Sequence, residues 1–427
     1  MRHDSVPHLD IVGHDVYAAS VPHTAYDEFR MVAPVAWINE TEANGHHGTG
    51  FWSLTSHEHV VAVHKDWRTF SSEVGGTEIE GLEHDPEARA ARRTMLETDP
   101  PLHTKLRQLV NPVFSKVAVE TYAAHAAKLI DLVISEALRV GTRDGHIDGV
   151  HGIARELPIR MLTGLLGVPD QDAPRLFEWA DQIVYNADPD YSPAVSDQVD
   201  TDPYRLLPFR SPVSLKVLEY VQRLSAARQG ATGGDVLTVL ANALVDGRPL
   251  TEREQGTFFL LLLIAGNETT RHSLAHGLLA FAEHPEQLHR LRSDPSLLET
   301  ATEEVLRWTS PQLHFRRTVT VNTAIGEVAV AAGDKVVTWY MAANRDPALF
   351  PNPHTFDIGR TPNRHVTFGG GGPHLCLGQW MARLEVRSFL QTLVEKVERV
   401  ELAGEPRRVR SNFINGLKEL PIRLVER

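Results

Sequence analysis

The stretch FGGGGPHLCLG, residues 368–378, contains Cys376, the only cysteine of the chain, directly before a long helical pattern. Its glycine-rich turn exposes backbone N–H groups, and the start of the next helix adds partial positive charge. Both features favour a thiolate and can orient its sulfur toward a metal. A lone cysteine is more often a small buried core residue. A phosphate-binding glycine loop would need Lys-Ser or Lys-Thr after the glycines, whereas Pro373 and His374 follow here. We therefore predict a metal-bound thiolate.

Composition indicates one large domain over residues 1–427, because no linker, repeat or low-complexity block divides the 427 residues. The hydrophobic fraction of 42% suffices for a large core, and a single cysteine excludes an internal disulfide. A net charge of −12 argues against a DNA or RNA partner. The start MRHDSVPHLD lacks a signal-peptide pattern, and the longest apolar run, Phe258–Ala265, is far shorter than the about 20 residues of a membrane span. We expect a soluble, cytoplasmic protein without membrane insertion.

Most segments have helical periodicity. A helix is predicted over Val117–Val140, with Leu129, Leu132, Ile134 and Leu138 on its apolar face. Strand-like alternation is limited to four short segments, which are Val35–Ile38, Val60–Val63, Thr318–Val321 and Val336–Trp339. Irregular structure is predicted for the acidic, glycine-bearing segment Ser71–Glu97 and for the proline-rich segment Tyr185–Pro212. Such segments can form an entrance or lid, or can be simple surface connections.

The longest helix is expected to begin at Thr251, where TERE offers a capping box, and to run to about Glu283. Its middle is anomalous, because the polar run at residues 266–270, GNETT, follows the most hydrophobic segment of the chain. One explanation is a close helix crossing at Gly266, with Thr269 bonded to its own helix. The other is a functional cavity that the polar groups face.

The cysteine loop resembles the haem-ligand loop of the cytochrome P-450 family, and the resemblance covers nearly the whole chain. Cys376, Gly378 and His374 fall in register with the family pattern. Phe368 lies eight residues before the cysteine instead of seven, so one glycine is inserted, as in family branches that look like actinobacterial sterol, branched-lipid and terpenoid hydroxylases. The resemblance implies a mainly α fold with a long central helix over the haem and small β-sheets at one side.

The same resemblance implies roles for individual residues. Cys376 would bind the haem iron, Thr269 would hold the oxygen ligand and its water, and Glu268 would relay protons. Arg317 is expected to bind a haem propionate, with Arg316 as a close competitor. The full set of expected cofactor contacts is His103, Arg107, Ala265, Gly266, Arg317, Phe368, Gly369, His374, Cys376 and Gly378.

The segment Ser296–Trp308 places Arg307 three residues after Glu304 and four after Glu303, so either acid can meet it on one helix face. Taken alone, such a pair is more often exposed and adds only about 0.2–0.5 kcal/mol. The resemblance makes Glu304 and Arg307 the family's ExxR motif, with Arg360 as third member of a buried network.

We therefore predict a haem-thiolate monooxygenase with haem b and O₂, which hydroxylates an unactivated C–H bond. No nicotinamide or flavin site is evident, so electrons are expected from NAD(P)H through a ferredoxin reductase and a ferredoxin. A basic docking face near the cysteine loop would include Arg383 and Arg387. We expect a monomer.

The predicted substrate is a sterol, a terpenoid or a branched alkyl chain, because AGNETTRHS, FSSEVGGTEIE and FINGLKELPI look like the lipid-hydroxylating branch. The predicted pocket residues are Val74, Leu82, Leu206, Phe209, Leu261, Leu313 and Ile414. An alternative is a tailoring oxidase that acts on a polyketide or on a carrier-protein-bound amino acid. A haem sensor without turnover is a third class. A zinc hydrolase is disfavoured, because neither His46 with His47 nor His57 with His59 belongs to a zinc-binding pattern.

Overall fold

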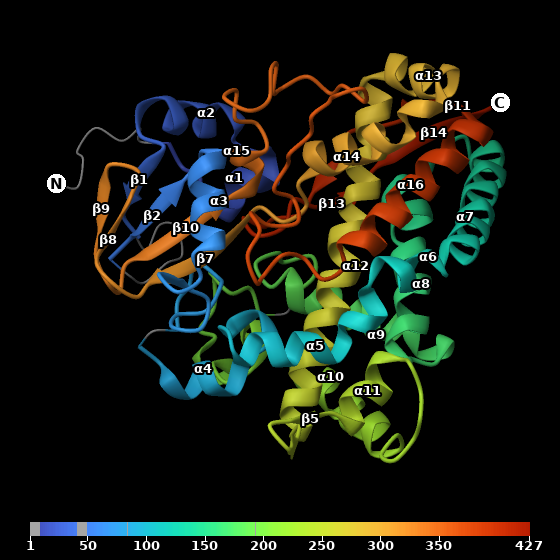
Figure 1. Ribbon diagram of the computed structural model, residues 1–427. Helices are drawn as coiled ribbons and strands as arrows, with labels where there is room; N and C mark the ends of the chain where they lie inside the picture. Colours follow the sequence, from blue (N-terminus) through green and yellow to red (C-terminus); the bar gives the residue numbers. More distant parts are fainter. Residues whose placement is uncertain (1–8, 41–48, 83, 193) are drawn as a thin grey trace.

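A mixed β-sheet lies on one side of the protein and a larger group of helices on the other (Figure 1). The computed structural model describes residues 9–40, 49–82, 84–192 and 194–427. The described residues do not include residues 1–8, which belong to the start considered for a signal peptide. They also do not include the pair His46 and His47. About 52% of the structure is helical, which confirms the mainly α fold with small sheets.

The helices up to the central one are α1 (His14–Ala19), α2 (His23–Val32), α3 (His57–Lys65), α4 (Pro86–Arg92), α5 (Leu102–Phe114), α6 (Lys116–Glu120), α7 (Ala123–Asp144), α8 (Glu156–Leu166), α9 (Ala173–Val184), α10 (Val213–Ala226) and α11 (Val236–Asn242). They are followed by α12 (Glu252–Glu283), α13 (Pro285–Ser293), α14 (Leu298–Thr309), α15 (Tyr340–Ala343) and α16 (Gln379–Lys396).

The largest sheet has the strand order β1-β2-β10-β7-β3, formed by β1 (Val35–Ile38), β2 (Phe51–Leu54), β10 (Lys335–Trp339), β7 (His314–Val319) and β3 (Phe70–Ser71). Strand β10 pairs antiparallel with β7, where Val336 lies opposite Arg317 and Val337 opposite Arg316. Because neighbouring strand residues point to opposite faces, only one of the two arginines can face a given side of the sheet.

The smaller sheets contain β11 (Val397–Leu402), β14 (Pro421–Glu426) and β4 (Ile147–Asp148), β12 (Arg407–Arg408) with β13 (Leu417–Glu419), β5 (Leu244–Val245) with β6 (Arg248–Pro249), and β8 (Thr323–Ile325) with β9 (Val328–Val330).

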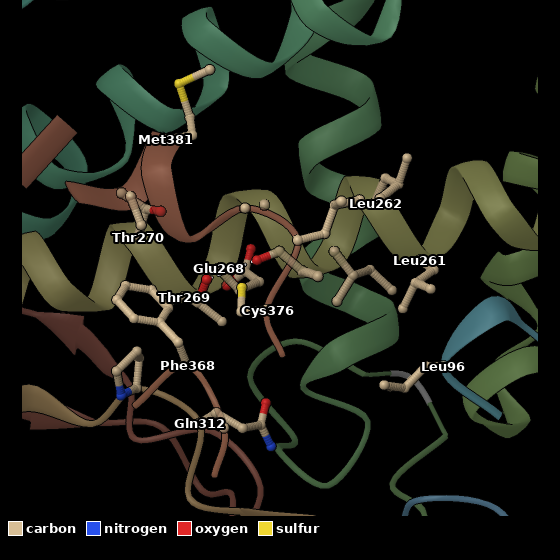
Figure 2. A pocket seen from close by; sticks show the side chains of 18 of the residues that line it. Leu96, Leu261, Leu262, Glu268, Thr269, Thr270, Gln312, Phe368, Cys376 and Met381 are labelled. Atoms are coloured by element: carbon tan, nitrogen blue, oxygen red, sulfur yellow. Dashed lines mark hydrogen bonds between the residues drawn. The ribbon is translucent and has the colours of Figure 1, made fainter. Parts of the chain in front are cut away.

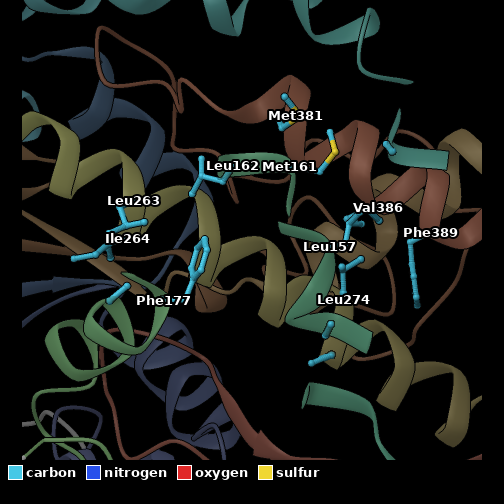
Figure 3. Packing of buried hydrophobic residues seen from close by; sticks show 14 of the residues in the cluster. Leu157, Met161, Leu162, Phe177, Leu263, Ile264, Leu274, Met381, Val386 and Phe389 are labelled. Atoms are coloured by element: carbon cyan, nitrogen blue, oxygen red, sulfur yellow. The ribbon is translucent and has the colours of Figure 1, made fainter. Parts of the chain in front are cut away.

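The central helix α12 crosses the helical part of the molecule and is buried along most of its length (Figure 1). Its predicted capping box is present: the Thr251 side chain accepts from the Glu254 N–H, and the Glu254 carboxylate accepts from the Thr251 N–H. Figure 3 shows the core that surrounds α12, with Met161 of α8, Phe177 of α9 and Phe389 of α16 among its members. The apolar run Phe258–Ala265 covers several faces of the helix and favours this burial.

Three secondary-structure predictions need correction. The segment Val60–Val63 lies in helix α3 and not in a strand, because Ser56 caps the helix and Val60, Val63 and His64 are buried at helical spacing. The predicted helix at Val117–Val140 is divided at Thr121 into α6 and α7.

Leu132 is 53% exposed, so it lies off the apolar face of α7. The strand predicted at Thr318–Val321 ends at Val319, as β7. The other two predicted strands are confirmed. In the segments predicted as irregular, helix α4 and several short 3₁₀ turns interrupt the loops.

Candidate functional site

A large cavity lies between the middle of α12 and the cysteine loop (Figure 2). Its empty volume is about 1740 Å³, counting the part open to solvent. Leu261 and Leu262 of α12 line one part, while Phe368 and Cys376 approach α12 at Glu268 and Thr269 (Figure 2).

The cysteine loop packs directly on helix α3. The Cys376 N–H donates to the Phe368 carbonyl over 2.9 Å, and this bond closes the loop. Gly372 has a φ of 73°, and a Cβ there would lie 2.2 Å from the His64 carbonyl oxygen. Only glycine fits this backbone conformation so close to α3. The loop contains one glycine more than the family pattern, and Phe368 nevertheless lines the same cavity as Cys376.

Burial raises the pKa of the Cys376 thiol, although the Gly378 N–H and the guanidinium groups of Arg107 and Arg383 oppose the shift. The Gly378 N–H therefore favours the thiolate, as expected of the loop, but burial outweighs this effect in the protein without a metal. A bound cation would change this balance, because coordination deprotonates a thiol.

Four basic side chains line the cavity near Cys376, namely His103, Arg107, Arg317 and His374. The rings of His103 and His374 lie 4.1 Å apart. Burial and the two arginines lower the pKa of His103 to about 4, and burial also holds the pKa of His374 well below its usual range. Both imidazoles are thus neutral at pH 7, and the two arginines carry the positive charge.

Three of the ring nitrogens of these two imidazoles lack hydrogen-bond partners in the described part of the chain. Within the described residues, Nδ1 of His103 and both ring nitrogens of His374 are buried and unpaired. Buried polar atoms nearly always have a partner, so these atoms indicate a ligand that accepts hydrogen bonds.

The alternation of β7 separates the two competing arginines. Arg317 lines the cavity, where its guanidinium lies 3.4 Å from Nδ1 of His64. Arg316 faces the other side of the sheet and donates to Thr318 Oγ1 over 3.3 Å. The sequence interpretation that favoured Arg317 therefore agrees with its position.

The polar run of α12 combines both explanations considered for it. The Thr269 hydroxyl donates to the Ala265 carbonyl over 2.7 Å, and a Cβ on Gly266 would lie 3.0 Å from Cδ1 of Leu162 in α8. These contacts are those of a close helix crossing. Ala265, Gly266 and Thr269 nevertheless also line the cavity.

Glu268 lines the cavity and belongs to a buried polar network. Its carboxylate accepts from the Tyr185 hydroxyl, from Arg271, and from Nδ2 of Asn267 over 2.5 Å. Arg271 also binds Asp181 over 2.6 Å. The two acids thus share this arginine.

The two acids of this network differ in protonation. Burial raises the pKa of Glu268. Burial opposes the charge on Asp181 as well, but Arg271 lowers the pKa of Asp181 overall. The arginine charge therefore balances Asp181, and Glu268 is the acid that holds a proton.

The predicted network of Glu304 and Arg307 on α14 with Arg360 is present and buried. Arg307 donates to Glu304 through Nε and a terminal nitrogen, over 2.7 and 2.8 Å. Nε of Arg360 lies 3.2 Å from the same carboxylate. The alternative partner Glu303 instead binds Arg383.

Residues 219–405 match the family model for cytochrome P450. The chain is 33% identical over 417 residues to the steroid C26-monooxygenase of Rhodococcus jostii, covering 97% of this chain and 84% of that protein. It is 34% identical over 423 residues to the linalool 8-monooxygenase of Pseudomonas putida, covering 97% of this chain and 98% of that protein. The chain belongs to the cytochrome P450 family. A solved structure, a Mycobacterium marinum cytochrome P450 in complex with pseudoionone, has a TM-score of 0.86 at 31% identity, with 99% of both chains covered.

As a cytochrome P450 the protein is a monooxygenase that uses haem and O₂. The residues of the cavity fit this cofactor. Cys376 offers a sulfur ligand for iron, and the charges of Arg107 and Arg317 match the two haem propionates. The unpaired nitrogens of His103 and His374 offer hydrogen bonds to the same carboxylates. These assignments stay proposals, and so do those for Gly369 and Gly378, which also line the cavity.

The arginines predicted for a docking face of this P450 are not free. Arg383 binds Glu303 over 2.7 Å and lies 4.4 Å above the Phe368 ring. Arg387 binds Glu299 over 3.2 Å. Their charges are thus compensated by neighbouring acids, so these two residues do not by themselves form a basic surface.

Three of the predicted pocket residues, Phe209, Leu261 and Ile414, line the cavity of the P450. The other four, Val74, Leu82, Leu206 and Leu313, are described by the structure but are absent from the cavity wall. Val74 is 40% exposed, Leu82 packs near the loop at Gly76, the Leu206 carbonyl binds Arg253, and Leu313 belongs to the core beside Trp339.

Sequence analysis missed Tyr185, Asp181, Arg271 and His272 around the proposed proton relay. Arg271 and His272 follow Glu268 by three and four residues on one helix, and this spacing could have indicated them. Tyr185 and Asp181 come from α9 and its end, and no local signal connects them to α12.

Proposed function

We propose that the protein hydroxylates an unactivated C–H bond of an uncharged hydrophobic molecule, namely a sterol, a terpenoid or a branched alkyl chain. The observation that carries this proposal is the cavity between α12 and Cys376, whose wall is mostly apolar apart from the groups that would serve haem and protons. Two similar proteins are named for a steroid and for linalool, which supports the same class.

Haem would supply the activation of O₂ and the abstraction of hydrogen from the substrate. The apolar side chains orient the substrate and exclude water. Thr269 offers a hydroxyl at the cavity wall, and the Glu268 carboxyl beside it holds a proton that this hydroxyl and water can receive. Tyr185 and Arg271 fix the position of that carboxyl.

An acidic cavity beside the first supports a free, uncharged substrate over a carrier-bound one. A second cavity meets the first at Val184, Phe209 and Phe413. Its lining in the described chain includes Glu78, Glu80, Asp197, Asp200 and Asp202 against Arg210. Arg92, Arg210 and Arg410 pair with four of these five acids. The three arginines leave an excess of carboxylates, which repels anions such as the phosphate of a carrier-protein arm.

The electron donor proposed is a ferredoxin, reduced by an NAD(P)H-dependent reductase. This part rests on the resemblance, because Arg383 and Arg387 are both ion-paired. Among the described helices, none is both long and apolar enough to cross a bilayer. The cytoplasmic location, the monomeric state and the single domain stay predictions.

The test is a titration of the haem-loaded protein with pairs of ligands that share one skeleton, a terpenoid or sterol alcohol and the matching carboxylate. We expect the neutral member to shift the haem absorption at lower concentration, and we expect its hydroxylation when ferredoxin, reductase and NAD(P)H are added. Tighter binding of the carboxylates, or turnover only of carrier-bound acyl groups, would contradict the proposal.

A further inference from the structure

One amide side chain in the cavity wall has no part in the roles assigned above. Gln312 lies between α14 and β7, lines the cavity and is 9% exposed. Pro311, Phe413 and Ile414 line the same cavity, so the amide belongs to a mostly apolar part of the wall. Phe413 also lines the second cavity, so this part of the wall lies where the two cavities meet.

The backbone fixes the position of Gln312. It forms an isolated antiparallel bridge with Ile414. The N–H of the next residue, Leu313, donates to the Phe413 carbonyl over 2.9 Å. The side chain of Gln312 therefore extends from a braced segment of the wall and not from a loose loop.

Hydrogen bonds also fix the amide group itself. Its Nε2 atom donates to the carbonyl oxygens of His314 and Phe413, over 2.9 and 3.1 Å. An amide NH₂ group has two hydrogens, so both are used. The opposite orientation would place the amide oxygen against two carbonyl oxygens, which cannot donate. The two bonds thus determine which amide atom is the nitrogen.

The remaining amide atom, Oε1 of Gln312, is an acceptor without a donor among the described residues. Figure 2 shows this oxygen on the side of Cys376 and the nitrogen on the other side. Nearby wall hydroxyls do not serve it, because those of Thr269 and Thr367 donate to backbone carbonyls. A buried amide oxygen nearly always has a partner, so this atom indicates a donor that the ligand or water supplies.

We propose that Gln312 is a specificity-determining residue, whose Oε1 accepts a hydrogen bond from a hydroxyl group that the substrate carries before the reaction. Because both amide hydrogens are used, Gln312 can accept from the substrate but cannot donate to it. It therefore favours an alcohol over the matching ketone, ether or hydrocarbon, none of which donates. This inference rests on the proposed function and narrows its substrate class to sterol, terpenoid or branched-chain alcohols.

The first test uses probes that bind the haem iron through an imidazole nitrogen, so it requires no substrate. Each probe carries a hydroxyl group on an alkyl arm, and arms of increasing length are each paired with the matching methyl ether. We expect an arm length at which the alcohol binds the haem-loaded wild type about tenfold more tightly than its ether, from the shift of the haem absorption. Equal affinities at every length would overturn the inference.

The variant Gln312→Met removes the amide and keeps a side chain of similar length. We expect it to bind each alcohol and its ether with equal affinity. The matched control is Gln391→Met, because Gln391 is exposed on α16, where it donates to Glu395. This control should keep the preference of the wild type.

The ratio of the two affinities separates recognition from a structural role. A purely structural role of Gln312 would weaken the binding of alcohol and ether alike and leave the ratio unchanged in Gln312→Met, which would overturn the inference. If Gln312→Met fails to bind haem, the comparison of alcohol with ether in the wild type decides.

A second test distinguishes this inference from the proposed function. It compares linalool with its methyl ether, and a 3-hydroxy sterol with the matching 3-ketone, by binding and by product formed with ferredoxin, reductase and NAD(P)H. We expect the wild type to prefer the alcohols and Gln312→Met to lose this preference. Turnover of these compounds without preference for alcohols would overturn the inference but not the proposed function. An alcohol preference with the imidazole probes, but no turnover of any sterol, terpenoid or branched chain, would contradict the proposed function and support the role of Gln312.

Discussion

Replacing Glu304 by glutamine removes the one negative charge that two buried arginines share. Glu304 and Arg307 are both 0% exposed, and Arg360 is 9% exposed. Oε1 of Glu304 accepts from Arg307, from Arg360 and from the Asp357 N–H, whereas Oε2 accepts from Arg307, from Arg360 and from Asn363. Glutamine turns one oxygen into an NH₂ group, so three donors at that position face another donor.

The magnitude follows from this geometry. Removing one partner of a buried ion pair lowers the free energy of unfolding by about 3–5 kcal/mol, because the remaining charge stays buried without a partner. A domain has about 5–15 kcal/mol of total stability, so Glu304→Gln should lose a large share of it. The network also fixes segments near the cysteine loop, since Arg307 donates to the carbonyls of Asn344 and Pro353 over 2.8 and 3.0 Å.

The assay compares Glu304→Gln with Glu303→Gln, one residue earlier. Glu303 is 28% exposed and binds Arg383 and His365, so its loss should cost about 1 kcal/mol. We expect Glu304→Gln to lower the unfolding temperature far more and to reduce the haem content of the purified protein. Equal unfolding temperatures and haem contents for the two variants would refute the reasoning.

Three further predictions concern single residues. Tyr185→Phe removes a hydrogen bond to Glu268. It should lower the amount of product formed per electron consumed, measured as product against NAD(P)H oxidised. An unchanged ratio would assign Tyr185 a structural role only. Gly372→Ala should reduce haem content and thermal stability, because the new Cβ would lie 2.2 Å from the His64 carbonyl oxygen. The control is Gly230→Ala, where φ is 75° and the space around the glycine is open. This variant should show only the backbone strain of about 1–2 kcal/mol. Glu385→Gln should change the pH dependence of stability. The folded pKa of Glu385, about 8, lies above the ordinary 4.5, so between these values the folded state keeps a proton that the unfolded state has released. Relative to the variant, the wild type should therefore lose about 1.4 kcal/mol of stability per pH unit in this range. Parallel curves of unfolding temperature against pH for the wild type and this variant would contradict that assignment.

The sequence predicted the features that depend on local spacing. The capping box at Thr251, the pair of Glu304 with Arg307, and the cysteine loop before a helix each lie within one or two helical turns or one continuous loop. Each motif combines particular residue types at a particular spacing, so it could be recognised from the sequence before the fold was known. The short strand predicted at Val60–Val63 was wrong because a run of four apolar and small residues fits either period.

The features that were missed depend on which elements meet. Nothing in the segment around Glu385 distinguishes a buried carboxyl from an exposed one, because its burial follows from the crossing of α16 with α12. In the same way, Leu313 and Leu82 were predicted as pocket residues. The fold instead places Leu313 in the core beside Trp339 and Leu82 near the loop at Gly76. Pocket residues were predicted best on α12 itself, where helical periodicity fixes the face.

The buried acids of the cavity follow one principle of charge balance. The core contains the carboxyl groups of Asp181, Glu268 and Glu385. Among the described residues, Arg271 is the one cation that contacts both Asp181 and Glu268. No cation contributes to the pKa shift of Glu385. Arg271 lowers the pKa of Asp181 overall, and Arg155 lies 3.6 Å from the same carboxylate, so Asp181 is the anion. The other two carboxyl groups then lie next to the cavity in their protonated forms: Glu268 is held by hydrogen bonds, and Oε2 of Glu385 has no partner in the described part of the chain. A cavity that must receive protons but exclude bulk water is served by such neutral acids, because they carry a proton without a permanent buried charge.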